Sequence, residues 1–167
     1  MKQKSFAGMR CPIARALDVV GDRWILLLVR DLSLGVSRYD DLRSSTGIPD
    51  ATLSSRLKHL ILHGIVKRVR YQASPPRDEY RLTSKGNDLW KVSVALREWG
   101  ERWGASGFSA STLETVDAQT GHPLRLALVD PHTGMKVPKE CVRLQAGYGA
   151  DDTLRDRIDQ VNRRLAK

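Results

Sequence analysis

The sequence has few cysteines and no long apolar run, and both absences exclude whole classes of protein. Its two cysteines, Cys11 and Cys141, are too few for a disulfide framework. No stretch approaches the ~20 apolar residues that a helix needs to cross a bilayer. Residues 1–9 carry two lysines but no apolar segment, so they do not resemble a secretory signal. We therefore expect a globular, cytoplasmic protein.

Motifs of catalysis and metal binding are also missing. The sequence has no nucleophile elbow and no phosphate-cradling glycine loop. His59 and His63 lie four residues apart on a predicted helix, but no thiol or carboxylate with ligand spacing supports them. We expect no metal, no cofactor and no enzymatic activity.

Positive charge is concentrated in one part of the chain. The formal net charge is +9. Residues 1–105 hold 19 Lys and Arg against 11 Asp and Glu, whereas residues 106–167 hold 9 against 8. A concentrated basic field attracts polyanions and accelerates their association. Charge alone is weak evidence, but it makes the first part of the chain the candidate for nucleic-acid binding.

Apolar spacing and capping residues predict most of the elements. Helices are expected over residues 12–20, 24–34, 38–45, 50–63, 84–103 and 153–165. Their expected N-terminal caps include Cys11 before Pro12, Asp22, a Ser37/Asp40 capping box, Asp50, and Thr83 or Ser84. β-prone runs over 65–71 and 80–83 flank a basic, proline-bearing loop, which predicts a hairpin. A second hairpin is expected from strands over 124–129 and 135–144, although Pro138 interrupts the latter.

The order of these elements is that of a winged helix-turn-helix. We therefore expect an α+β, mainly α fold with a long C-terminal helix suited to dimerisation. The winged helix-turn-helix would occupy residues 1–105. A small extension of β-hairpin plus helix would occupy residues 106–167, after a linker rich in small residues.

The helix over 50–63 has two chemically distinct faces. Its predicted inner face carries Leu53, Leu57, Leu60 and Ile61. Its predicted outer face carries Thr52, Ser55, Lys58 and His59, with Arg56 at the border. Small side chains let the backbone approach a major groove, and these donors can bind base edges or phosphates. Taken alone, such a helix could equally be a solvated amphipathic helix.

Neighbouring segments favour DNA binding over that alternative. Ser37, Arg38 and Tyr39 stand at the N-terminus of a short helix, where backbone N–H groups favour a phosphate. Arg77 follows two prolines in the hairpin loop, and a stiffened loop with an arginine suits a narrow minor groove. A plain surface arginine is the alternative for Arg77.

Five short segments stand out along residues 11–103. They are Cys11-Pro12, Gly21-Asp22-Arg23-Trp24, Leu53-Ser54-Ser55-Arg56-Leu57, Pro75-Pro76-Arg77-Asp78-Glu79-Tyr80-Arg81-Leu82-Thr83 and Glu98-Trp99-Gly100. In type and order they resemble the HxlR family of winged helix-turn-helix transcriptional regulators, which is related to the MarR regulators. The resemblance implies a homodimer on a palindromic operator, with the recognition helix over 50–63 and the wing over 73–78.

The resemblance also implies a dimer interface and a candidate sensor. The long helix would join the N-terminal helix between subunits, with anchors at Trp90, Leu96, Trp99 and Trp103, unless these pack within one chain. Cys11 resembles a thiol that senses oxidants, and its helix N-terminus, Arg10 and Arg15 favour the thiolate. An unreactive packing thiol is the alternative. Some relatives carry paired cysteines suited to zinc in a similar extension, and Cys141 alone cannot build that site.

We therefore expect a sequence-specific, DNA-binding transcriptional regulator. Repression is the simpler expectation, because a bound dimer is enough to occlude a promoter. A small molecule or an oxidant is the candidate signal. The alternative function is a winged-helix adaptor that contacts only proteins.

Overall fold

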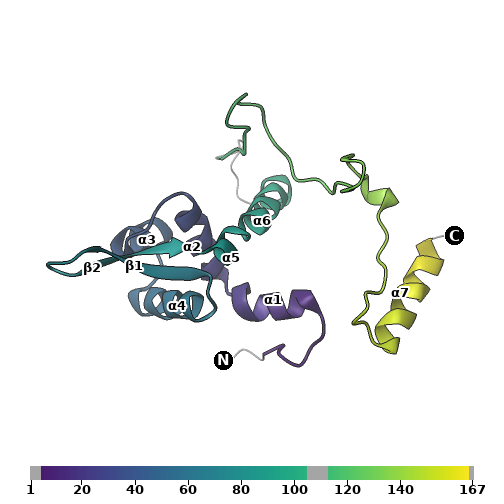
Figure 1. Ribbon diagram of the computed structural model, residues 1–167, viewed down its shortest axis with the longest axis horizontal. Coiled ribbons are helices and arrows are strands. Elements are labelled where there is room, and N and C mark those ends of the chain that lie inside the picture. Colours follow the sequence, from purple (N-terminus) through teal and green to yellow (C-terminus); the bar gives the residue numbers. More distant parts are fainter. Residues whose placement is uncertain (1–4, 105–112, 166–167) are drawn as a thin grey trace. The chain divides into compact units, whose positions relative to one another are not determined.

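The computed structural model describes residues 5–104 and 113–165 (Figure 1). The chain divides into two compact units, Met1–Thr115 and Val116–Lys167. The boundary expected between residues 105 and 106 lies outside the described residues. No helix in the described part of the chain has the length and apolar character needed to span a membrane.

The first unit has four helices before a two-stranded sheet. The helices are α1 (Pro12–Val20), α2 (Arg23–Ser33), α3 (Tyr39–Thr46) and α4 (Asp50–Leu62). β1 (Val66–Gln72) pairs antiparallel with β2 (Arg77–Leu82), and this hairpin projects beyond α3 and α4 (Figure 1). The predicted α+β, mainly α, winged helix-turn-helix fold is confirmed.

One apolar cluster holds these elements together. Its buried members are Ile25, Leu28, Val29, Leu32, Leu42, Ile48, Leu53, Leu57, Leu60, Ile65 and Val66. The helix α2 supplies four of them. This agrees with its sequence, in which apolar residues occupy nearly all sides of the helix. Because burying one such side chain contributes about 1.5–3 kcal/mol, the cluster fixes α3, α4 and the root of the hairpin around α2.

Two expected caps are wrong, because tertiary contacts use the side chains. Ser37 does not cap α3: its hydroxyl donates to Glu79 Oε2 on β2 at 3.1 Å. Asp50 does not cap α4 but forms its first residue, and its Oδ1 accepts from the Tyr39 hydroxyl at 3.0 Å. Both contacts join residues that are distant in sequence, and local spacing carries no information about them.

The long helix expected over 84–103 is also wrong, since it is two helices. These are α5 (Ser84–Asn87) and α6 (Trp90–Trp103). Thr83 caps α5 as predicted, accepting from the Gly86 N–H at 3.2 Å. Gly86 is buried so close to β1 that a Cβ there would lie 2.2 Å from the Ile65 carbonyl oxygen. This close approach requires a glycine at position 86, and the low helix propensity of Gly86, Asn87 and Asp88 favours a break after α5.

The second unit is built around α7 (Asp152–Leu165), as expected, with a short 3-10 helix at Lys139–Cys141. The expected β-hairpin is much shorter than predicted. Its two segments pair only through the antiparallel bridge of Val129 with Lys136 and the backbone hydrogen bonds from Asp130 to Met135 and from Val137 to Leu128. Val116 and Pro123 form a separate isolated bridge. Pro138 follows directly after this pairing and lacks the N–H that a longer ladder needs. None of the described side chains of residues 116–164 is buried.

Candidate nucleic-acid interface

The helix α4 presents a polar surface to solvent. Ser55 and Lys58 are exposed, and Thr52 is half-buried beside them. The opposite face is fully inside the core through Leu53, Leu57 and Leu60. Ile61 was expected on the inner face but is 38% exposed, and Leu62 is 82% exposed. The outward face of α4 therefore runs from small polar residues at its start to apolar ones at its end.

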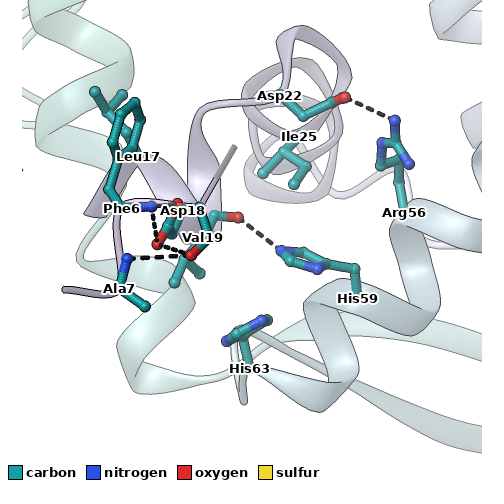
Figure 2. Close-up of a pocket in the computed structure, with 11 residues that line it drawn as sticks. Phe6, Ala7, Leu17, Asp18, Val19, Asp22, Ile25, Arg56, His59 and His63 are labelled. Carbon is teal, nitrogen blue, oxygen red and sulfur yellow. Dashed lines mark hydrogen bonds and ion pairs between the residues drawn. The ribbon is translucent and has the colours of Figure 1, made fainter. Parts of the chain in front are cut away.

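His59, expected on this outer face, and Arg56, expected at its border, point into the domain instead. Arg56 Nη2 donates to Asp22 Oδ2 at 2.7 Å, and His59 Nε2 lies 2.9 Å from the Val19 carbonyl oxygen. Figure 2 shows both side chains directed from α4 toward the junction of α1 and α2. The two contacts hold α4 on that junction, so Arg56 and His59 position the helix.

Asp22 stabilises two helices at once. Its carboxylate caps α2, accepting from the Trp24 N–H at 3.0 Å, and pairs with Arg56 of α4. Burial alone would raise the pKa of Asp22, but the hydrogen bonds from Arg56 and Trp24 and the charges of Arg56 and Arg23 lower it overall. Sequence reasoning found the cap and missed the ion pair, because local spacing predicts only the first.

The start of α3 offers one available cation. The Arg38 side chain is exposed, and its guanidinium lies 4.9 Å from the ring centroid of Tyr71 on β1. Ser37 is bonded to β2, and the Tyr39 hydroxyl donates to the backbone oxygen and to Oδ1 of Asp50, each at 3.0 Å. Burial and the neighbouring Asp50 raise the pKa of Tyr39. Of Ser37, Arg38 and Tyr39, only Arg38 therefore has a charged group that is accessible to a phosphate.

The wing carries two cations that sequence reasoning did not assign to the site. Arg68 Nε donates to Asp78 Oδ2 at 2.7 Å, and Arg70 Nε donates to Asp78 Oδ1 at 3.2 Å. The hydrogen bond from Arg68, with that from Arg70 and both charges, outweighs burial and lowers the pKa of Asp78. Arg77 is exposed and makes no ion pair with a described residue. The sequence did contain a feature that could have identified Arg68 and Arg70: they lie two residues apart, which places both on one face of a strand.

The helix α6 exposes large apolar side chains. The exposed fractions are 46% for Trp90, 49% for Leu96, 64% for Trp99 and 68% for Trp103. At ~100° per residue, Leu96, Trp99 and Trp103 fall on one face, while Trp90 lies on the opposite side of the helix. No residue of α6 is buried within this chain. An apolar patch of this kind marks an interaction surface.

Both cysteines are exposed thiols. Cys11 is the N-cap residue of α1 with Pro12 directly after it, as predicted. Cys141 ends the short 3-10 helix of the second unit. Groups of His, Cys, Asp and Glu able to hold a metal ion are absent from the described residues.

Curated relatives match the first unit. The HxlR-like helix-turn-helix family model matches residues 19–107. An uncharacterised HTH-type transcriptional regulator of Mycobacterium bovis is 46% identical over 91 residues, which are 54% of this chain and 58% of that protein's length. The match therefore spans little more than half of that relative. The Synechocystis regulator sll1512 is 36% identical over 97 residues, covering 58% of this chain and 72% of the relative.

Solved structures agree with this assignment. The crystal structure of PA1607, a candidate transcription factor, has a TM-score of 0.74 and 34% identity, covering 86% of this chain and 100% of that one. Because 86% of this chain is longer than the first unit, residues 1–115, the aligned part includes residues of the second unit. The oxidised form of the redox regulator HypR has a TM-score of 0.52 and 34% identity, covering 56% of this chain and 97% of that one. The chain belongs to the HxlR-like helix-turn-helix family of transcriptional regulators.

Proposed function

We propose that this regulator binds a palindromic operator as a homodimer and represses transcription by occluding a promoter. The observation that carries the proposal is the outward face of α4. Ser55 and Lys58 are exposed on a helix whose other face forms the core, and Arg56 and His59 hold it in place. A rigidly mounted helix with small polar side chains outward suits insertion into a major groove.

The surrounding cations supply the phosphate contacts of the proposed complex. Arg38 at the start of α3 would contact the backbone, and Arg77 at the wing tip would enter the adjacent minor groove. Arg68 and Arg70 are held side by side by Asp78, so binding a phosphate restricts their conformational freedom only a little further. Thr52 and Ser55 are left to contact bases.

A second copy of the chain is the proposed occupant of the exposed apolar face of α6. Leu96, Trp99 and Trp103 form that face, and α1 also exposes Ile13 and Leu17, at 72% and 48%. Aromatic residues are enriched in the buried centres of interfaces. A symmetric dimer also presents two copies of α4, and a palindrome with half-sites about 34 Å apart needs such a pair.

A gel shift with the DNA upstream of this protein's own gene tests the proposal, with excess nonspecific competitor at roughly 0.15 M salt. We expect a discrete, competitor-resistant shift. The triple variant Arg38→Ala, Lys58→Ala, Arg77→Ala should bind more weakly. The slope of its log affinity against log salt concentration should flatten by roughly 0.9 for each phosphate that the variant no longer neutralises. The matched control replaces Lys136, Lys139 and Arg143, three exposed cations of the second unit, by Ala and should bind normally.

Unchanged DNA affinity in the triple variant would contradict the site assignment. The absence of a shift would lead to selection from random-sequence DNA. Failure of that selection as well would contradict specific DNA binding and favour a protein-protein adaptor.

We also propose that Cys11 makes DNA binding sensitive to oxidants. Its thiol is exposed at the N-terminus of α1 and is therefore accessible to an oxidant in solution. HypR, which shares the fold, is a redox regulator. Oxidant treatment should change the gel shift of the wild type and leave Cys11→Ser unaffected. An equal response in both proteins would exclude this role for Cys11.

A further inference from the structure

A cavity of about 510 Å³ lies within the first unit (Figure 2). Its walls are the segment before α1, the end of α1, the start of α2 and one side of α4. Sites for small molecules range from about 300 to 1,000 Å³, so this cavity has room for a compound of one or two rings. Phe6, Leu17 and Ile25 supply apolar surface, while Asp18, His59 and His63 supply polar groups.

The carboxylates that line the cavity already have hydrogen-bond partners. Asp18 accepts from the Phe6 N–H and from the Ser5 hydroxyl, each at 2.9 Å. Asp22 accepts from Arg56 and from the start of α2. A ligand that needs a free carboxylate would therefore have to break existing bonds, at a cost comparable to the bonds it forms.

The unused hydrogen-bonding capacity lies on α4. The Val19 carbonyl can only accept, so His59 Nε2 carries the hydrogen, and in the neutral ring Nδ1 remains an acceptor. The ring nitrogens of His63 have no hydrogen-bond partner among the described residues, and the two ring centroids are 4.3 Å apart. Arg56 Nε is buried without a partner among the described residues. Figure 2 shows both imidazoles on the same wall of the cavity, opposite Phe6 and Leu17.

The charges around the cavity disfavour a charged ligand. Arg56 is paired with Asp22, so its charge is already neutralised. Burial, His59 and Lys85 lower the pKa of His63, which keeps that ring neutral at neutral pH. An organic anion would meet no unpaired cation among the lining residues and would approach Asp18. An organic cation would lose its hydration and find Asp18 already occupied.

We propose that this cavity is an effector site for an uncharged aromatic compound that carries a hydroxyl group. The ring packs against Phe6, Leu17 and Ile25, and the hydroxyl bonds to the imidazoles of His59 and His63. The regulatory part rests on the proposed function. The same side of α4 that lines the cavity is joined to the α1–α2 junction through Arg56 and His59, so we expect an occupant that bonds to His59 to alter how α4 is held and thereby its affinity for DNA.

Calorimetric titration of the full-length protein tests the site without DNA. The probes are naphthalenemethanol, naphthoate and naphthylmethylammonium, which share one ring system and carry a neutral, an anionic and a cationic group. We expect the neutral probe to bind at least about tenfold more tightly than either ion, a difference of about 1.4 kcal/mol. Equal or tighter binding of an ion would overturn the ligand class, and no binding by any probe would overturn the site.

Two variants locate the binding. His63→Phe keeps a flat ring but removes both nitrogens, and it should weaken the neutral probe by about five- to tenfold. His132→Phe, at an exposed position of the second unit, is the matched control and should bind as the wild type does. Phe6→Ala, on the opposite wall, should also weaken binding. Unchanged affinity in both His63→Phe and Phe6→Ala would place the probe elsewhere and overturn the site.

The regulatory half has its own readout. Naphthalenemethanol at saturation should change the midpoint of the DNA titration at least about threefold. His63→Phe should need a correspondingly higher probe concentration, about five- to tenfold, to reach the same change. An unchanged midpoint with intact probe binding would overturn the coupling alone. Absence of DNA binding would contradict the proposed function while the calorimetric result stands.

Discussion

At the residue scale, the ion pair of Asp22 and Arg56 holds the proposed recognition helix, α4, in position. The two residues are 34 positions apart in sequence, and their ion pair measures 2.7 Å. Side-chain exposure is 25% for Asp22 and 31% for Arg56, so solvent screens the pair only in part. Since Asp22 also caps α2, one carboxylate fixes the start of that helix and the orientation of α4.

The lowered pKa of Asp22 makes its contribution depend on pH. A group with a depressed folded-state pKa stabilises the protein above its unfolded pKa, about 3.9 for Asp, and loses this effect as the pH falls through the folded value. Asp22→Asn keeps a capping side chain and removes the charge. We expect this variant to be less stable than the wild type by about 1 kcal/mol at neutral pH.

Urea denaturation from pH 7 to pH 3 measures the effect, and the difference between the two proteins should shrink below about pH 4. Asp40→Asn is the control, because Asp40 is 84% exposed and lies 3.8 Å from Arg43. A difference for Asp22→Asn that is independent of pH would show that the charge contributes nothing.

At the element scale, Gly86 lets α5 approach the backbone at Ile65, just before β1, very closely. Gly86→Ala would place a Cβ 2.2 Å from the Ile65 carbonyl oxygen, which neither backbone can accommodate without moving. We expect a decrease of about 1–3 kcal/mol in the free energy of unfolding, measured by denaturation.

Gly100→Ala is the matched comparison within the same pair of helices. Its Cβ would meet nothing within 4 Å, and the residue lies inside α6. Because Ala favours a helix over Gly, this variant should be more stable by about 0.5–1 kcal/mol. Equal effects of the two substitutions would contradict the close approach at Gly86.

At the scale of the whole molecule, the apolar face of α6 should decide the oligomeric state. The double variant Leu96→Glu, Trp99→Glu should sediment as a monomer, because it buries charge in the proposed interface. Trp90→Glu changes an exposed Trp on the opposite side of α6 and should remain dimeric. A monomeric wild type in analytical ultracentrifugation would contradict the proposed dimer.

The two units should also differ in independent stability. Every buried apolar side chain among the described residues lies between Ala14 and Val66. A chain that ends at Thr115 should therefore keep a cooperative thermal transition in circular dichroism. Residues 116–167 alone should show none, because an isolated 14-residue helix is marginal in water. A cooperative transition in the isolated second unit would contradict this view of the core.

Much of the fold was predictable because its signals are local. The helical spacing of apolar residues, with Gly, Pro and cap residues at the expected ends, predicted α1 to α4 and α7. The caps at Asp22 and Thr83 are confirmed. The hairpin followed from two β-prone runs around a proline loop. The strands expected in the second unit were too long: the two segments pair only around Val129 and Lys136, and Pro138 supplies no N–H to extend the ladder.

The sequence alone determined the helix-turn-helix order, the polar outer residues Ser55 and Lys58, and the position of Arg77 in the wing. Tertiary structure decided which way Arg56 and His59 of α4 point. Periodicity placed Arg56 at the border of the two faces and His59, wrongly, on the outer one. Their partners Asp22 and Val19 come from a distant part of the chain, which helical spacing does not reveal. The same holds for Ser37, Asp50 and Gly86, whose local preferences are outweighed by contacts that exist only once the chain has folded.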